Sequence, residues 1–176
     1  MPVRKLLAFL AIAAATNVAT VAALPWLINA VVVHRLVERS GGYNVAVAWP
    51  RADAAARTIV RPSPDLLYTS CAFDVSARPL RITAPVPDGY LSISGFAANT
   101  DNFFALNDAD VAPAPGGRRQ LEVVLARAGT GGLPHGVRVI APPSDRGLIL
   151  FRTLITRDAD LPRLLELQAQ QRCEPL

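Results

Sequence analysis

Apolar and polar residues follow two different patterns along this chain. An uncharged apolar run extends from Leu6 to Val33, and from Tyr43 onward the apolar residues instead occur in short segments separated by Gly and Pro turns. A helix crosses a bilayer with roughly 20 apolar residues, and the first run is longer than that. The pattern predicts an N-terminal transmembrane helix with its extension over residues 1–40 and a β-rich domain over residues 41–176.

A cleaved signal peptide is the alternative explanation of the same apolar run. The stretch from Leu6 to Ala15 has the length of a leader core, and its last three alanines would present small residues to a peptidase. The apolar character continues past that point through Trp26 to Val33. This continuation favours an uncleaved anchor.

One face of the predicted helix carries a small residue at every fourth position. That spacing lets a second helix approach closely, although alanine is abundant in this chain and the spacing can also arise by chance. Pro25 and Asn29 are expected to kink the helix. The small residues of this face are Ala11, Ala15, Ala19 and Ala23.

The segment from Arg61 to Asp74 is the centre of the predicted domain. Pro62 and Pro64 impose an extended turn, and β-favouring residues follow from Leu66 with apolar side chains on both alternating faces. Strands of that composition are typically buried on both sides. We therefore expect a central strand here.

Further alternating segments precede and follow this strand. Residues 80–96 contain two such segments around a Pro/Gly turn, which predicts a hairpin. Because no helix separates the strands, the fold is predicted to be mainly β, an antiparallel sandwich or barrel, with a final helix from Asp158 or Asp160 covering one side or edge. The other predicted strands are Tyr43–Trp49, Gln120–Arg127, Val137–Ala141 and Gly147–Ile155.

Charge and composition argue against several functions. The net charge of +4 comes from scattered arginines, with Lys5 as the sole lysine, so no basic patch for a nucleic acid is expected. No G-x-G-x-x-G or Walker sequence is present, and His34 and His135 lack a zinc-ligand spacing. We therefore expect neither a cofactor nor a metal.

The two cysteines lie far apart in the sequence. Cys71 belongs to the predicted central strand, and Cys173 lies near the end of the predicted last helix. In an exported protein such a pair can form a disulfide. Two unpaired buried thiols are the alternative.

Arg152 is the one charged residue inside the predicted strand Gly147–Ile155. A buried arginine is costly without a partner, so we expect Asp65, Asp74 or Asp101 to meet it. Such a pair would either bind an anionic ligand or fix the register of the strands.

Two polar groups of residues are candidate sites. Asp65, Tyr68 and Ser70 would supply an acid, a phenol and a nucleophile, yet Ser70 lacks a G-x-S-x-G turn and a nearby histidine. Ordering of the turn by Asp65 is the simpler interpretation. The second group would line a ligand pocket, hold a cation or only form a tight turn, and it consists of Asn99, Asp101 and Asn102.

Five motifs occur in order along the chain: Pro64–Tyr68, Phe73–Ser76, Pro87–Tyr90, Asn99–Phe103 and Leu150–Leu154. Together they resemble the bacterial family called domain of unknown function 1254, over residues 43–176. Larger members carry a second domain, of the unknown-function 1214 family, on the same chain. The resemblance implies either a separate 1214-family protein as partner or no such partner.

These observations lead to one expected function and two alternatives. We expect a non-enzymatic protein with a single pass through the bacterial inner membrane, whose periplasmic domain binds a partner domain or a small apolar ligand. The first alternative is an envelope hydrolase that uses Asp65, Tyr68, Ser70 and Arg152. The second is a subunit of a membrane complex that docks through the alanine face.

Overall fold

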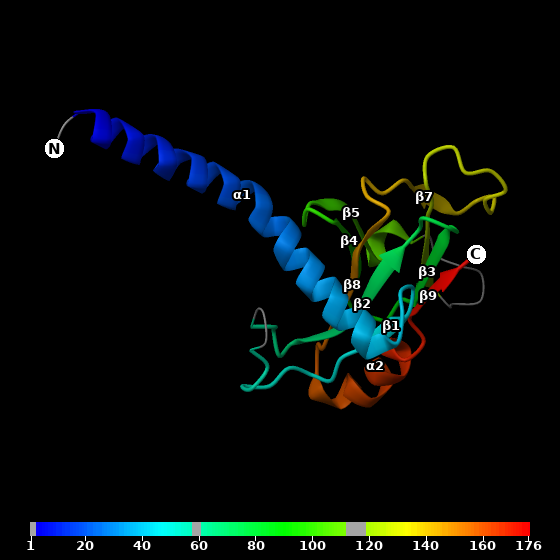
Figure 1. The fold of residues 1–176 in the computed structure, drawn as a ribbon. Coiled ribbons are helices and arrows are strands. Elements are labelled where there is room, and N and C mark those ends of the chain that lie inside the picture. Colours follow the sequence, from blue (N-terminus) through cyan, green and yellow to red (C-terminus); the bar gives the residue numbers. More distant parts are fainter. Residues whose placement is uncertain (1–2, 58–60, 112–118) are drawn as a thin grey trace.

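A computed structural model of the protein describes residues 3–57, 61–111 and 119–176. It contains a long apolar helix, α1 (Val3–Ser40), followed by nine strands in two sheets and a short helix, α2 (Leu161–Gln168). The predicted β-rich fold with a helix at each end is therefore confirmed. Figure 1 shows the first part of α1 projecting away from the strands.

The five-stranded sheet has the strand order β1-β2-β8-β4-β5, and all its pairs are antiparallel. The four-stranded sheet has the order β7-β6-β3-β9, and its β6–β7 pair is parallel. Among the described residues neither sheet closes into a barrel. The strands are β1 (Ala46–Ala48), β2 (Leu66–Asp74), β3 (Leu80–Pro85), β4 (Leu91–Ala97), β5 (Asn102–Asn107), β6 (Gln120–Leu125), β7 (Arg138–Ile140), β8 (Arg146–Leu154) and β9 (Arg172–Pro175).

The two sheets share one hydrophobic core. Alternate residues are buried in β8, with Ile149 and Phe151, and in β3, with Leu80 and Ile82, whereas the first five residues of β4 are all buried. This alternation buries one face of each sheet and leaves the other face for further contacts. A disulfide between Cys71 in β2 and Cys173 in β9 connects the two sheets, with 6.6 Å between the Cα atoms.

The hairpin predicted for residues 80–96 is wrong. β3 lies in the four-stranded sheet between β6 and β9, whereas β4 lies in the five-stranded sheet between β8 and β5. The turn between them thus carries the chain from one sheet to the other. Local alternation cannot distinguish this crossover from a hairpin, because both require two strands and a turn.

The prediction for β2 was partly wrong. β2 is an inner strand, but β8 occupies the centre of the sheet. Leu67, Cys71 and Phe73 are buried on the core face, whereas Tyr68 and Ser70 on the other face are only half-buried. The hydroxyl groups of Tyr68 and Ser70 form hydrogen bonds with neighbouring segments. These two polar side chains are therefore accommodated on the face of β2 that points away from the core.

Two strands were not predicted, β5 and β9. The polar residues Asn99–Asn102 predict a turn, so the strand that starts at Asn102 was not predicted. A β-bulge between Gly95 and Phe96 lets β5 pair with β4. A Cβ atom on Gly95 would lie 2.2 Å from the ring of Phe104, so only glycine fits there.

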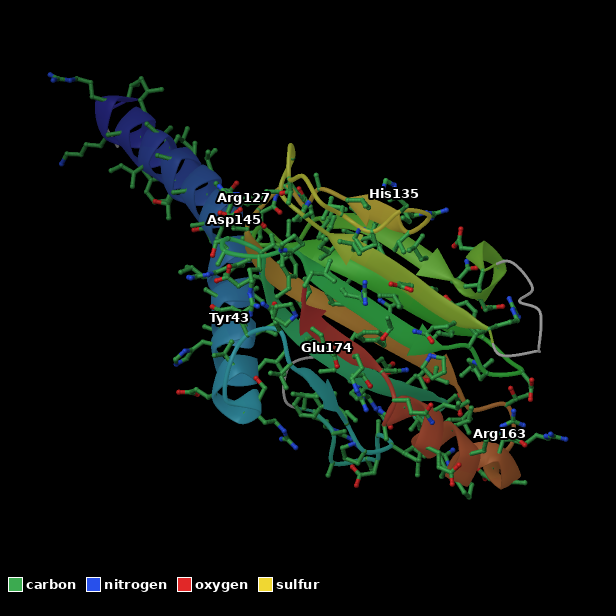
Figure 2. All side chains as sticks on the ribbon, turned by 90° about the vertical axis from the view of Figure 1, so that its right-hand side faces the viewer. Tyr43, Arg127, His135, Asp145, Arg163 and Glu174 are labelled. Atoms are coloured by element: carbon green, nitrogen blue, oxygen red, sulfur yellow. A yellow bond between two sulfur atoms is a disulfide. The ribbon has the colours of Figure 1, made fainter. Side chains whose placement is uncertain are left out.

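The last helix, α2, closes one end of the body. Leu164 packs with Leu67 and Ile155. The side chain of Gln168 donates to the carbonyl groups of Tyr68 and Trp49 at 2.8 and 3.1 Å. These contacts connect α2 to β2 and to the residue that follows β1. Figure 2 shows Arg163 of α2 at the end of the body opposite the exit of α1.

Candidate functional site

The candidate site is the outer face of the five-stranded sheet, defined as the side that points away from the core. It includes Tyr68 and Ser70 of β2, Leu150 and Arg152 of β8, and Ser92 and Ser94 of β4, which are aligned by the strand register. The outer face of the other sheet is different, because it carries ion pairs such as Arg81 with Glu122 at 3.2 Å. The outer face of the five-stranded sheet instead mixes polar and apolar side chains, and Ser92 and Ser94 on it are buried.

Tyr68 and Ser70 hold local structure with their hydroxyl groups. The hydroxyl of Tyr68 accepts a hydrogen bond from the backbone N–H of Ser63 at 3.0 Å, which fixes the Pro-rich turn. Oγ of Ser70 accepts a hydrogen bond from Nε1 of Trp49 at 3.0 Å, which holds the chain just after β1. The hydroxyl of Ser70 therefore has a structural role in the folded chain.

The expected burial and pairing of Arg152 are wrong. Its side chain lies on the outer face and is half-buried, and within the described parts of the chain it makes no ion pair or hydrogen bond. Of the proposed partners, Asp74 instead bonds Arg146 at 2.6 Å, and Asp65 is exposed at the start of β2. Arginine can project its guanidinium group into water from such a face, so no internal carboxylate is required.

The oxygen-rich group lies far from Arg152. Ala97, just before this turn, pairs with Gly147 at the other end of β8, and five residues of strand separate positions by roughly 17 Å. The side chains of Asn99 and Asp101 bond to each other, and Thr100 between them has a φ of 71°. This geometry is that of a tight turn. The predicted site residues thus do not form a single cluster.

The C-terminal part of α1 packs on one side of the outer face. Asn29 is 6% exposed, and its Nδ2 donates to the carbonyl of Ala97 at 2.9 Å. Farther along the helix, Val33 and Leu36 pack against Ala72 and its apolar neighbours. Pro25 and Asn29 were expected to kink α1, and both lie within the uninterrupted helix Val3–Ser40. A polar residue inside an apolar run was the signal for this contact.

An aromatic contact holds the end of α1. The guanidinium group of Arg39 lies 4.4 Å from the ring centre of Trp49, within the range of a cation–π interaction. Trp49 also belongs to the apolar group around Ala72. The last turns of α1 are therefore joined to the body by polar, aromatic and apolar contacts together.

A charged pair lies beside this joint. Burial raises the pKa of Asp74, but hydrogen bonds from Ser76 and Arg146 outweigh it and hold that pKa below its ordinary value of 3.8. The same hydrogen bond with Asp74 raises the pKa of Arg146. Arg146 also lies over the ring of Tyr43 at 5.1 Å. Figure 2 shows Tyr43 on the α1 side of the body.

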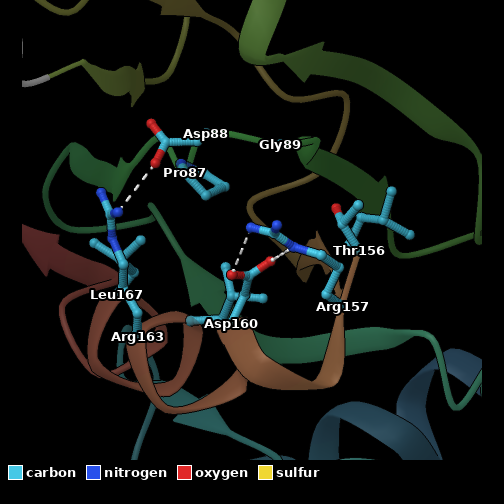
Figure 3. A pocket seen from close by; sticks show the side chains of 10 residues that line it. Pro87, Asp88, Gly89, Thr156, Arg157, Asp160, Arg163 and Leu167 are labelled. Carbon is cyan, nitrogen blue, oxygen red and sulfur yellow. Dashed lines mark hydrogen bonds and ion pairs between the residues drawn. The ribbon is translucent and has the colours of Figure 1, made fainter.

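Three hollows on the described surface are large enough to consider. The one in Figure 3, about 200 Å³, lies between α2 and the β3–β4 turn. Its charges are paired internally, Arg163 with Asp88 at 3.1 Å and Arg157 with Asp160 at 2.9 Å. The hydrogen bond from Arg157 lowers the pKa of Asp160. This arrangement leaves neither a free cation for an anion nor an unpaired acid.

The second hollow, about 400 Å³, lies beside β6 and β7, and the third, about 300 Å³, separates part of α1 from the body. Neither these two nor the hollow of Figure 3 is lined by Tyr68, Ser70 or Arg152. The residues of the hydrolase alternative therefore do not surround any of the three hollows.

Comparison with known proteins identifies a family and a fold. The sequence model described as "Protein of unknown function (DUF1254)" matches residues 43–175. Among curated proteins, none matches the chain.

Two solved structures are similar at low sequence identity. The VPA0106 protein from Vibrio parahaemolyticus has a TM-score of 0.64 at 18% identity, with 86% of this chain and 35% of that chain covered. A putative uncharacterized protein from Burkholderia cenocepacia has a TM-score of 0.52 at 16% identity, with 82% and 39% covered. This chain therefore spans little more than a third of either relative. Residues 41–176 alone are too few to account for the covered share of this chain. The match therefore also includes part of α1.

Proposed function

The chain belongs to the DUF1254 family, and on that premise we propose that it is a membrane-anchored assembly module. In this proposal the N-terminal part of α1 crosses the bacterial inner membrane once. The strands form a sandwich-like body in the periplasm, and the outer face of the five-stranded sheet binds a partner protein.

The observation that carries the proposal is the division of α1 into two parts. It is long and apolar enough to cross a membrane, and its most apolar stretch makes no buried contact with the body. From Asn29 onward the same helix is docked on the sheet. A helix of this kind both anchors the body and holds it close to the bilayer.

The cross-link between the sheets supports a periplasmic position. Disulfides persist in oxidising compartments such as the periplasm and are rare in the cytosol. Cys71 and Cys173 are both buried and joined. Charge does not decide the orientation, because Arg4 and Lys5 before the apolar run are balanced by Arg35 and Arg39 after it. The disulfide is therefore the main support for a periplasmic body.

The composition of the outer face is consistent with binding of a protein partner. Leu150 and Phe96 are half-buried there. Leu150 lies two residues from the charged Arg152 on the same strand, whereas Phe96 pairs with Leu148 farther along β8. A partner that covers this face would bury apolar area and would need a carboxylate opposite Arg152. Since the solved relatives are almost three times longer than their matched part, a separate 1214-family protein is the partner we propose.

The test is copurification of the full chain with a co-expressed 1214-family protein. Changing Arg152→Glu should reduce the amount of recovered partner at least tenfold, because the new carboxylate would face the carboxylate that the partner places opposite Arg152. Arg78→Glu makes the same charge change in an exposed turn outside this face and should leave recovery unchanged. Failure of the wild-type chain to recover the partner, or equal losses for the two variants, would contradict the proposal.

A further inference from the structure

We propose that the crevice between α1 and the body, about 300 Å³ in volume, binds one phospholipid of the surrounding leaflet. Its acyl chain would lie against α1, and its phosphate would lie at Arg146. This inference rests on the proposed membrane anchoring and names a ligand for the joint that this anchoring creates.

The position of the crevice follows from helix length. Counted from Leu6, a helix needs roughly 20 residues to cross the hydrocarbon layer, which places the far boundary near Pro25. The first α1 residue that lines the crevice is Trp26. Tryptophan is enriched at the boundary between hydrocarbon and headgroups. The crevice therefore opens at the level where lipid headgroups begin.

The α1 wall of the crevice continues the apolar surface of the membrane segment. Trp26, Ala30, Val33 and Val37 recur at intervals of three or four residues and so share one helix face. Ala30 and Trp26 are exposed rather than covered by the body. The α1 wall also includes Asn29 and His34. Asn29 is buried and donates to the Ala97 carbonyl, and His34 pairs with Glu38 at 3.2 Å, so the apolar positions remain for contact with a lipid chain.

The body supplies the opposite wall and the charge. Gly147, Ala98 and Tyr43 line it, with Arg146 at the rim. Nε of Arg146 is held by Asp74 at 2.6 Å, whereas its terminal amino groups make no hydrogen bond within the described part of the chain. Arginine binds phosphate oxygens through such groups. The fixed Nε bond leaves them oriented for a headgroup.

The size also agrees with a lipid fragment rather than a whole soluble ligand. Ligand pockets usually have volumes of roughly 300 to 1,000 Å³ and enclose most of the ligand. This crevice is at the lower end of that range and lies where it would open to the bilayer. Such a site fits a ligand whose remainder stays in the membrane.

The test measures lipid retained by the full chain. The protein is reconstituted in nanodiscs of phosphatidylcholine and phosphatidylglycerol, extracted in mild detergent, and its bound phospholipid is counted by native mass spectrometry. We expect one tightly held phospholipid per wild-type chain. Ala30→Trp fills the crevice and should lower this occupancy at least fivefold, whereas Ala19→Trp, on the exposed membrane segment, should not.

A second variant, Arg146→Gln, tests the lipid site without changing α1, whose packing on the body Ala30→Trp would alter. Arg146→Gln leaves the α1 wall unchanged and should lower retention of phosphatidylglycerol at least threefold. No retained lipid in the wild-type chain, or equal retention by the wild type, Ala30→Trp and Arg146→Gln, would overturn the inference. The anchoring itself is tested separately by resistance of the chain to extraction from membranes at alkaline pH. If the chain resists extraction but retains no lipid, only the lipid site is refuted.

Discussion

Replacing both Cys71 and Cys173 with alanine removes the disulfide that cross-links the two sheets. The residues are 102 positions apart. In the chain-entropy description, a cross-link that closes a loop of about 100 residues stabilises the folded state by about 4.7 kcal/mol. Whole domains are commonly stable by only about 5–15 kcal/mol. The double variant should therefore lose a large part of the stability of the body.

Urea unfolding of the full chain in detergent micelles measures this loss. The fluorescence of Trp49 reports on the body, because this side chain packs beside β1 and α1. With a urea slope of about 1–3 kcal/mol per molar, the midpoint should fall by at least about 1.5 M.

Reduction of the wild-type chain provides the matched control. Dithiothreitol should lower the wild-type midpoint to that of the double variant and should not change the variant itself. Equal midpoints for the oxidised wild type and the variant would refute the reasoning, because the sheets would then not be stabilised by a cross-link.

Three further changes test the packing and the charges. Asp74→Asn should cost about 1–2 kcal/mol at pH 7, since it weakens the bond to Arg146. The pKa of Asp74 is lowered from 3.8 on folding, so this stabilisation is fully present above about pH 5 and is lost as the pH falls through the folded pKa. Wild type and variant should therefore converge in urea melts at strongly acidic pH, and a difference that stays constant with pH would contradict this. Gly147→Ala should destabilise the body by at least about 2 kcal/mol, because the added Cβ would lie 2.2 Å from the Phe96 carbonyl oxygen. Urea unfolding measures this loss, and an unchanged urea midpoint would show that the strands can separate there. Trp49→Phe should cost about 1 kcal/mol by thermal unfolding followed by circular dichroism, through loss of its hydrogen bond on the outer face, and an unchanged melting temperature would contradict that role.

The sequence was sufficient to predict single elements whose pattern is long or strong. The apolar run predicts α1, and β2 and β8 match segments with clear β patterns. Partner choice was not predictable, because β3 and β4 have the same local pattern whether they pair with each other or join different sheets. Strand pairing depends on contacts between residues far apart in the sequence.

The candidate site was predictable in part for the same reason. Tyr68, Ser70 and Arg152 do share one face, which the alternation of each strand determines once the register is known. The sequence does not reveal which face meets the core, and so Arg152 was expected to be buried. The role of Asn29 required the position of Ala97, which only the folded chain provides.

The most direct test of the account is the intact mass of the protein recovered from alkaline-washed bacterial membranes. If one helix is both membrane anchor and docking element, the chain should remain in the membrane pellet with α1 intact and a mass near 18.8 kDa. Release into the supernatant, or a shorter chain cleaved after Ala15, would contradict it.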